Sequence, residues 1–186
     1  GLTDWWADRI DTAFFNHICG MSAATDLRYT GHNAVVAPTT GRIFRAGANT
    51  DDVTVASATA SNIFTLSMID HMVEAAKTAS PLIRPVQTEM GPYYVLFLHP
   101  YQVTDMRTAT AAAGSWTDIQ KAAMTGGMVE KNPIFTGALG VYNGVIIHES
   151  TRVTLGVNTS STSQTGARRA VLCGAQAATI AFGQDN

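Results

Sequence analysis

An uninterrupted apolar run at residues 93–98 (YYVLFL) constrains the fold more than any other part of the sequence. Its residue types favour a β-strand, and the absence of polar alternation is typical of a strand that is covered on both faces. If the run were exposed, it would promote aggregation. The sequence therefore predicts an interior strand of a layered domain, introduced by Gly91-Pro92 and ended by Pro100.

Helical spacing of apolar residues predicts two longer and two shorter helices. The clearest helix covers about residues 61–79, where Ser61 is a good N-cap. An amphipathic helix over residues 2–18 opens the chain. Shorter helices are expected over residues 100–107 and from Ser115, and the second of these starts with a capping box.

Residues typical of turns, and the alternation of apolar with polar residues, predict further strands. The pair Asn143-Gly144 favours a tight type I′ turn between strands at residues 140–142 and 145–147. Alternation over residues 151–157 predicts a half-buried strand, whereas residues 158–166 are polar and are expected to form a surface loop. Other strand-like segments are residues 34–36, 42–45 and 168–181. Together these elements predict an α+β fold with a mixed or antiparallel sheet.

Charged residues are scarce: they make up 14% of the 186 residues, against about 25% in an average protein. Two interpretations stay open, a neutral polar surface and a surface that faces other protein subunits. The net charge of −2 argues against a free nucleic-acid binder. The sequence also contains no apolar run of about 18 residues that could span a membrane.

Common enzyme motifs are absent from the sequence, which has neither a Gly-rich phosphate-binding loop nor a Gly-x-Ser-x-Gly turn. Its two cysteines, Cys19 and Cys173, cannot make a disulfide framework. Apolar neighbours flank both of them, which favours buried and unreactive thiols. We therefore expect no catalytic residues and no cofactor.

The best candidates for a metal site are two histidines, each at the end of a predicted strand, and two carboxylates: His99, His148, Asp105 and Glu149. Zinc accepts imidazole and carboxylate ligands, so a metal-dependent hydrolase is an alternative function. The segment that begins His148-Glu149 lacks the second histidine of a helical zinc motif. A position at the edge of a sheet, where polar residues are common, explains His99 and His148 equally well without a metal.

Arginine residues near the end of the chain form a second candidate set. Arg168 and Arg169 are adjacent, and Arg152 precedes them by one predicted strand and loop. A solvated sheet edge and an inter-subunit salt bridge are both compatible with this pattern, and the sequence does not decide between them.

Six strings lie in order over nearly the whole chain: GLTDWWADRID (1–11), FFN (14–16), PLIRPV (81–86), GPYYVLFLHPYQ (91–102), WTDIQKA (116–122) and NPIFTGALGVYNGV (132–145). Taken jointly, they resemble one family of tailed-phage major capsid proteins, that of phage N-four. Members of that family are longer, so the resemblance implies that an N-terminal arm, an extended loop and a C-terminal segment are missing from this chain.

The resemblance implies a Hong Kong 97-like capsid fold, which combines a peripheral domain containing a long spine helix with an axial domain built on a central sheet. The helix at about residues 61–79 would then be the spine. Residues 1–86 would be peripheral-domain-like, and residues 87–186 would be axial-domain-like.

The function that the resemblance implies is that of a structural major capsid subunit. Such a subunit assembles with copies of itself, as hexamers and pentamers, into an icosahedral shell that encloses double-stranded DNA. Scaffolding, portal or decoration proteins are further candidate partners, with assembly in the host cytoplasm and residence in the virion. Contact with DNA should be weak because the net charge is slightly negative. The alternatives are the metal-dependent hydrolase using His99, His148 and Glu149, and a non-viral compartment shell protein.

Overall fold

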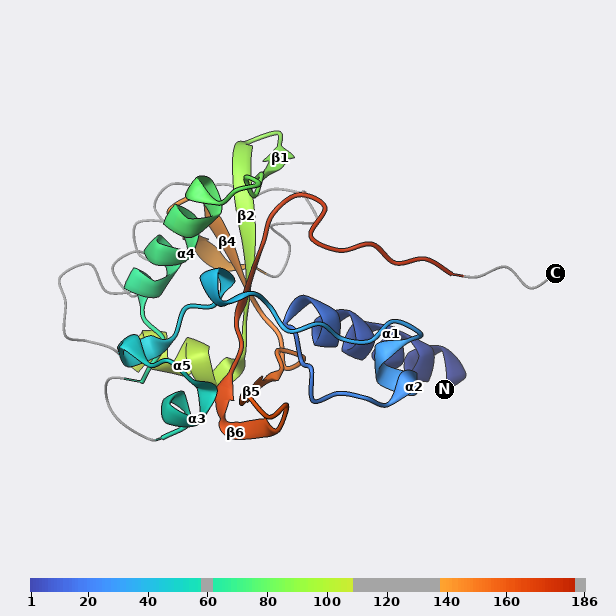
Figure 1. Cartoon of the computed structure of the whole chain (residues 1–186). Helices are drawn as coiled ribbons and strands as arrows, with labels where there is room; N and C mark the ends of the chain where they lie inside the picture. Colours follow the sequence, from blue (N-terminus) through green and yellow to red (C-terminus); the bar gives the residue numbers. More distant parts are fainter. Residues whose placement is uncertain (58–61, 109–137, 183–186) are drawn as a thin grey trace.

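A computed structural model describes residues 1–57, 62–108 and 138–182 of the chain (Figure 1). The fold is mixed α+β, with a five-stranded sheet, a separate two-stranded sheet and helices around them. The helices are α1 (Leu2–Ile18), α2 (Leu27–Thr30), α3 (Asp52–Val55), α4 (Leu66–Thr78) and α5 (Pro100–Thr108), with 3₁₀ turns η1 (Thr40–Arg42) and η2 (Ala46–Ala48). The strands are β1 (Val86–Thr88), β2 (Gly91–Leu98), β3 (Ala138–Tyr142), β4 (Val145–Glu149), β5 (Leu155–Val157), β6 (Ser163–Arg168) and β7 (Val171–Cys173).

Strand β2 is the centre of the larger sheet, as the apolar run at residues 93–98 predicts. It pairs in parallel with β4 and antiparallel with β1 and β7, and β3 pairs antiparallel with the outer side of β4. Tyr94, Leu96 and Leu98 are at most 4% exposed, whereas the residues between them are half-buried. Both faces of β2 are therefore covered, one of them more completely than the other.

Two different helices cover the two faces of β2, with α4 on one side and α1 on the other (Figure 1). Ile69 and Val73 of α4 belong to the same buried cluster as Leu96. On the opposite face, Phe97 meets Phe15 near the end of α1, with ring centroids 5.4 Å apart and planes at 83°. This edge-to-face geometry is a favourable arrangement for two aromatic rings.

Helix α4 is shorter than the helix predicted over residues 61–79. It has 13 residues, so it is about 20 Å long, and its N-cap is Thr65. Residues 62–65 are not helical because Phe64, which is 4% exposed, reaches the core from the non-helical segment that precedes Thr65. The predicted N-cap Ser61 lies outside the described residues. Among those residues the longest helix is α1, with 17 residues.

Helix α1, as predicted over residues 2–18, holds the short helix α2 through side chains. Arg9 Nε donates to the carbonyl oxygen of residue 28 at 2.6 Å, and Asn16 Nδ2 donates to that of residue 29 at 2.9 Å. The His17 ring lies 2.7 Å from the carbonyl oxygen of residue 30. Carbonyl groups at the end of a helix lack intrahelical partners, so these contacts satisfy α2 from outside.

Several predicted strands are wrong or misplaced. Residues 34–36 and 42–45 form no strand, because this segment runs through short helical turns without a partner strand. The strand expected over 151–157 is limited to β5, and the polar segment 158–166 includes the first part of β6. Within 168–181, only β7 and the last residue of β6 are strand. The helix expected from Ser115 lies outside the described residues.

The predicted turn between β3 and β4 is confirmed. Asn143 and Gly144 both have positive φ, 47° and 71°, as a type I′ turn requires. The turn is also fixed to α4, because the carboxylate of Asp70 accepts hydrogen bonds from Tyr142 Oη at 2.9 Å and from Asn143 Nδ2 at 2.8 Å.

Replacing Gly144 by alanine should destabilise the protein by about 1–2 kcal/mol, because a Cβ disfavours the left-handed backbone conformation even where space is free. Urea unfolding measures the effect. Gly41→Ala is the matched control, since a Cβ at Gly41 also meets nothing within 4 Å and its φ is not positive. Equal unfolding midpoints for the two variants would contradict the turn geometry.

No helix in the described part of the chain combines the length and the apolar character that a membrane crossing needs.

Candidate functional site

Three of the four candidate metal ligands, His99, His148 and Glu149, lie at one end of the sheet, whereas Asp105 lies on α5, and the four do not form a site. The parallel pairing places Phe97 opposite His148 and Leu98 opposite Glu149, so His99 follows at the same edge. His148 and Glu149 are adjacent in a strand and point to opposite faces. Within residues 1–57, 62–108 and 138–182, no group of three or more His, Cys, Asp or Glu side chains could hold a metal ion.

His99 has a structural environment instead. Its Nδ1 accepts a hydrogen bond from the backbone N–H of Tyr101 at 3.3 Å, and the ring centroids of His99 and Tyr101 are 4.6 Å apart. Burial lowers the pKa of His99, and the charge of Arg168 lowers it further, against the opposite effect of Glu149. The imidazole is therefore neutral at pH 7 and fits a role in packing. The described residues therefore contain no set of ligands that would support a metal-dependent hydrolase.

A buried ionic cluster joins three distant segments of the chain. Asp52 is 5% exposed, and its Oδ1 accepts Arg45 Nε at 2.8 Å. Its Oδ2 accepts Arg169 Nε at 2.9 Å and the backbone N–H of Val157 at 2.7 Å. We refer to Arg45, Asp52, Val157 and Arg169 as the Asp52 cluster.

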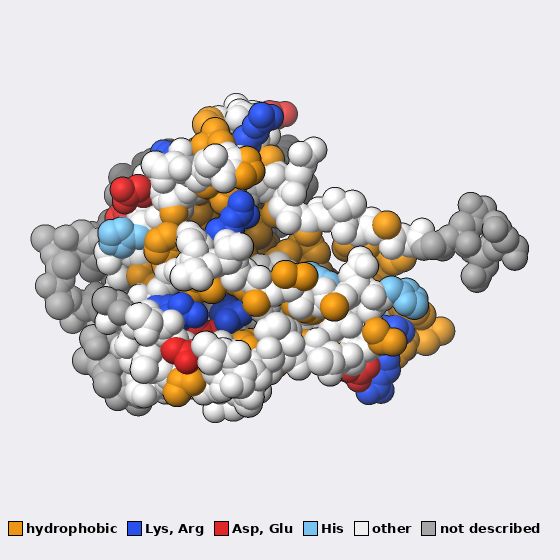
Figure 2. Space-filling view, in the orientation of Figure 1, with side chains coloured by type: hydrophobic (Ala, Val, Ile, Leu, Met, Phe, Trp, Pro, Cys, Tyr) orange, Lys and Arg blue, Asp and Glu red, His pale blue; other side chains and the backbone are white. Residues whose placement is uncertain are grey.

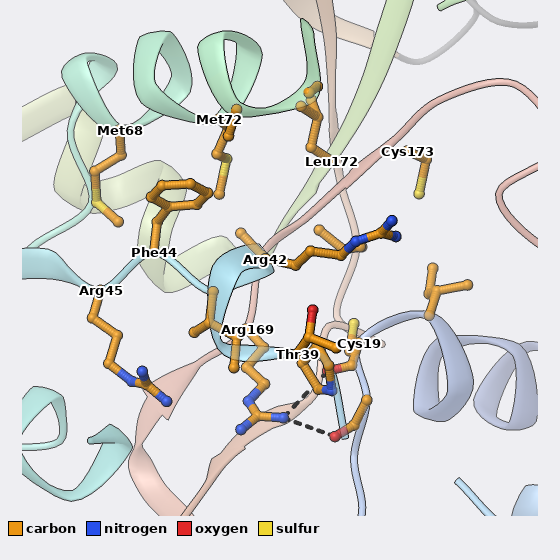
Figure 3. Close-up of a pocket in the computed structure, with 18 of the residues that line it drawn as sticks. Cys19, Thr39, Arg42, Phe44, Arg45, Met68, Met72, Arg169, Leu172 and Cys173 are labelled. Atoms are coloured by element: carbon orange, nitrogen blue, oxygen red, sulfur yellow. Dashed lines mark hydrogen bonds between the residues drawn. The ribbon is translucent and has the colours of Figure 1, made fainter. Parts of the chain in front are cut away.

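The cluster keeps Asp52 ionised. Burial raises the pKa of this carboxyl, but the hydrogen bonds from Val157 and Arg45 and the charge of Arg169 outweigh burial, so the pKa is lowered overall. Arg169 also donates to the carbonyl oxygens of Cys19 at 3.4 Å and Gly20 at 2.7 Å (Figure 3). A buried charge is tolerated only when it is paired and hydrogen-bonded in this way.

The three arginines near the end of the chain have different environments. Arg169 lies in the Asp52 cluster, so neither a solvated edge nor an inter-subunit salt bridge describes it. Arg152 forms an ion pair with Asp8 of α1, and both side chains are partly exposed. Arg168 lies over the ring of Tyr101, 5.7 Å from its centroid, and donates to the carbonyl oxygen of Val153 at 3.3 Å.

Both cysteines are free thiols. Burial raises the pKa of Cys19, and it raises the pKa of Cys173 to about 11. A thiol with a raised pKa stays protonated at neutral pH and is a poor nucleophile. The expectation of unreactive cysteines is therefore supported, although Cys173 is only half-buried.

An open pocket lies between α4, residues 36–46 and residues 170–177. Met68 and Met72 of α4 and Phe44 lie together on one side of it, and Arg42 extends across its middle (Figure 3). Among the described residues, five arginines and two acidic residues line this pocket, which gives their side chains a formal charge of +3 in a chain whose net charge is −2. The pocket therefore combines an apolar wall with an excess of positive charge.

The exposed large apolar side chains include two groups, one on the first turns of α1 and one in the segment after β7. Leu2, Trp5 and Trp6 on the first turns of α1 are 73%, 47% and 48% exposed. Ile180 and Phe182, in the extended segment after β7, are 53% and 77% exposed. Figure 2 shows hydrophobic side chains around the free end of α1. Exposed apolar groups of this size are typical of surfaces that contact another protein.

Comparison with solved structures shows that the chain shares its fold with one phage capsid. The chain is similar to the capsid of Ralstonia phage GP4, with a TM-score of 0.62 and 24% sequence identity over 81% of this chain and 43% of that chain. The capsid asymmetric unit of cyanophage Pam1 gives a TM-score of 0.48 and 21% identity, over 81% of this chain and 42% of that chain. This chain thus spans less than half the length of either. No curated protein sequence gives a significant match.

A family model described as phage capsid protein matches residues 1–186. This match covers every string on which the resemblance to phage capsid proteins depends, and it decides against the metal-dependent hydrolase and the non-viral compartment shell. The chain belongs to the phage capsid protein family and is a structural, non-enzymatic protein of the phage virion.

Proposed function

We propose that the protein is a major capsid subunit that assembles with copies of itself into an icosahedral shell around double-stranded DNA. The match of the capsid family model to residues 1–186 is the observation that carries the proposal. The low share of charged residues, 14%, supports it because the centres of protein interfaces are depleted in charge. Of the two interpretations of this composition, we therefore favour a surface that faces other subunits.

A Hong Kong 97-like arrangement is part of the same proposal. The central sheet lies almost wholly within residues 87–186, which supports an axial-domain-like part there. Helix α4 shares its core with β2, so we assign α4 to that part as well, although it precedes residue 86. The role of spine helix then fits α1 better, since α1 is longer and its first half points away from the sheet (Figure 1).

Scaffolding, portal or decoration proteins are further candidate partners of such a subunit, and the host cytoplasm is the proposed place of assembly. Packaged DNA is expected to touch the shell weakly and without sequence preference, because the chain carries a net charge of −2.

Electron microscopy of the full-length protein after expression tests the proposal. We expect closed shells of uniform diameter, because identical subunits with complementary contacts assemble into closed symmetric particles. The variant Leu96→Asp, which should not fold, serves as the control and should give no shells. Only monomers, under conditions in which related shells assemble, would contradict the proposed function.

A further inference from the structure

The open pocket beside α4 gathers most of the chain's arginines. Five of the nine arginines line it, whereas Lys77, the lysine within the described residues, does not. Three of these arginines are engaged: Arg45 and Arg169 bind Asp52, and Arg168 binds a backbone carbonyl. Arg42 and Arg84 are exposed, and neither guanidinium has a hydrogen bond or an ion pair within the described part of the chain. The pocket therefore presents two cations that have no partner among the residues described in the structure.

An apolar wall accompanies these cations. Met68 and Met72 project from α4 toward Phe44, which is 40% exposed, and Arg42 lies beside them (Figure 3). Methionine side chains adapt to different partners because they are flexible and polarisable. A phosphate backbone would use the two arginines but not this wall. An acidic amphipathic segment of protein would use both.

The first half of α1 has this chemistry. Leu2, Trp5 and Trp6 are its exposed apolar residues, and three aspartates against one arginine leave residues 2–11 with a formal charge of −2. Asp11 is exposed and has no ion pair among the described residues. A helix that inserts apolar anchors into an apolar groove is a common mode of recognition between proteins.

The helix that enters the pocket must come from another molecule. Residues 17–20, at the end of α1, already line the pocket of their own chain. Because α1 is a rod of 17 residues, about 25 Å long, its first turns point away from that pocket (Figure 1). The same orientation leaves those turns free to reach a neighbour.

We propose that the pocket receives the first half of α1 from a second copy of this chain. This contact rests on the proposed function. It adds the two surfaces through which neighbouring subunits would meet. It is heterologous, since one patch binds a different patch, and repeating it generates a ring or an open chain of subunits. Trp5 and Trp6 are the anchors, and Arg42 and Arg84 pair with the acidic side of the helix.

Two double variants test the contact: the pocket variant Arg42→Glu/Arg84→Glu and the helix variant Asp4→Lys/Asp11→Lys. All four side chains are exposed, so both variants should fold. In sedimentation velocity at high protein concentration, we expect the unchanged chain to associate and each variant alone to associate at least about 10-fold more weakly. The matched control Lys77→Glu/Arg107→Glu reverses two charges outside the pocket and should associate like the unchanged chain.

Mixing the two variants separates this contact from other modes of association. Each retains the surface that the other has lost, and the two reversed surfaces carry opposite charges, so an equimolar mixture should associate more strongly than either variant alone. With Trp116→Phe as background, the fluorescence of Trp5 and Trp6 should shift to shorter wavelength on pairing, because the indoles leave water. Cross-linking between Trp5 of one copy and Phe44 of another, each replaced by cysteine, should follow the same pattern.

Three results would overturn the proposal. The first is that the unchanged chain does not associate at any concentration, and the second is that both variants associate as it does. The third is that the pocket variant loses affinity for a DNA duplex while its self-association is unchanged, which would assign the pocket to DNA. If the full-length protein carrying either double variant still forms shells, the proposed function stands and only this contact is wrong.

Discussion

Replacing Leu96 by aspartate should abolish folding. Leu96 is 0% exposed, lies at the centre of β2 between β4 and β7, and faces α4 across the core. The substitution removes a packed side chain, which costs about 2–5 kcal/mol, and it buries an unpaired carboxylate, which costs several kcal/mol more. Since a domain of this kind is stable by only about 5–15 kcal/mol, the folded state should be lost.

Circular dichroism and urea unfolding of the purified variant measure this effect. We expect no cooperative transition and accumulation of the variant in inclusion bodies. Leu27→Asp is the matched control, because Leu27 is 62% exposed at the start of α2, where an acidic residue is favourable. A Leu96→Asp variant that melts like the unchanged protein would show that β2 is not the central strand.

Asp52→Asn should have the second largest effect, a loss of about 3–5 kcal/mol in the free energy of unfolding. Asparagine keeps the size of the side chain but removes the negative charge between Arg45 and Arg169, whose side chains are only 16% and 14% exposed. Two buried guanidinium groups would then repel each other without a counter-charge. Urea unfolding at pH 7 measures the loss.

Asp26→Asn is the matched control, since Asp26 also pairs with an arginine, but at the surface. Asparagine caps a helix about as well as aspartate, and exposed ion pairs contribute little, so this variant should unfold almost like the unchanged protein. Similar losses in the two variants would contradict the account of the Asp52 cluster.

The pH dependence gives an independent check on Asp52. Its pKa is lowered in the folded state from the ordinary value of about 3.8, so the stabilisation is complete above that value. It is lost as the pH falls through the lower folded-state pKa, where the carboxylate takes up a proton. The difference in stability between the unchanged protein and Asp52→Asn should therefore shrink below about pH 3.8. A difference that stays constant into this acid range would contradict the lowered pKa.

Local signals account for the elements that the sequence predicts correctly. Helix α1 follows from its apolar spacing, β2 from its apolar run, and the β3–β4 hairpin from Asn143-Gly144. In each case the information lies within about twenty consecutive residues. The start of α4 is predicted wrongly because the spacing of apolar residues continues through Phe64, which reaches the core without being helical.

Long-range contacts account for what the sequence does not show. Strand β6 is mostly polar, and only its pairing with β5 and the burial of Ala167 make it a strand. The Asp52 cluster combines residues from segments that carry no motif, and the open pocket arises where three distant segments meet. No periodicity along the chain could have identified the Asp52 cluster or the open pocket. The high share of arginine among the basic residues is a weak indication of both.

The spacing of the Asp52 cluster along the chain also has a kinetic consequence. Its hydrogen bonds join Asp52 to residues 105 and 117 positions away, whereas α1 and α2 are linked over 13 to 19 positions. Because closing such long loops costs chain entropy before the contact is made, we expect these contacts to form after the transition state for folding. Asp52→Asn should accordingly speed unfolding and leave the refolding rate nearly unchanged. On this expectation the buried carboxylate lengthens the lifetime of a folded subunit and has little influence on how quickly one is made.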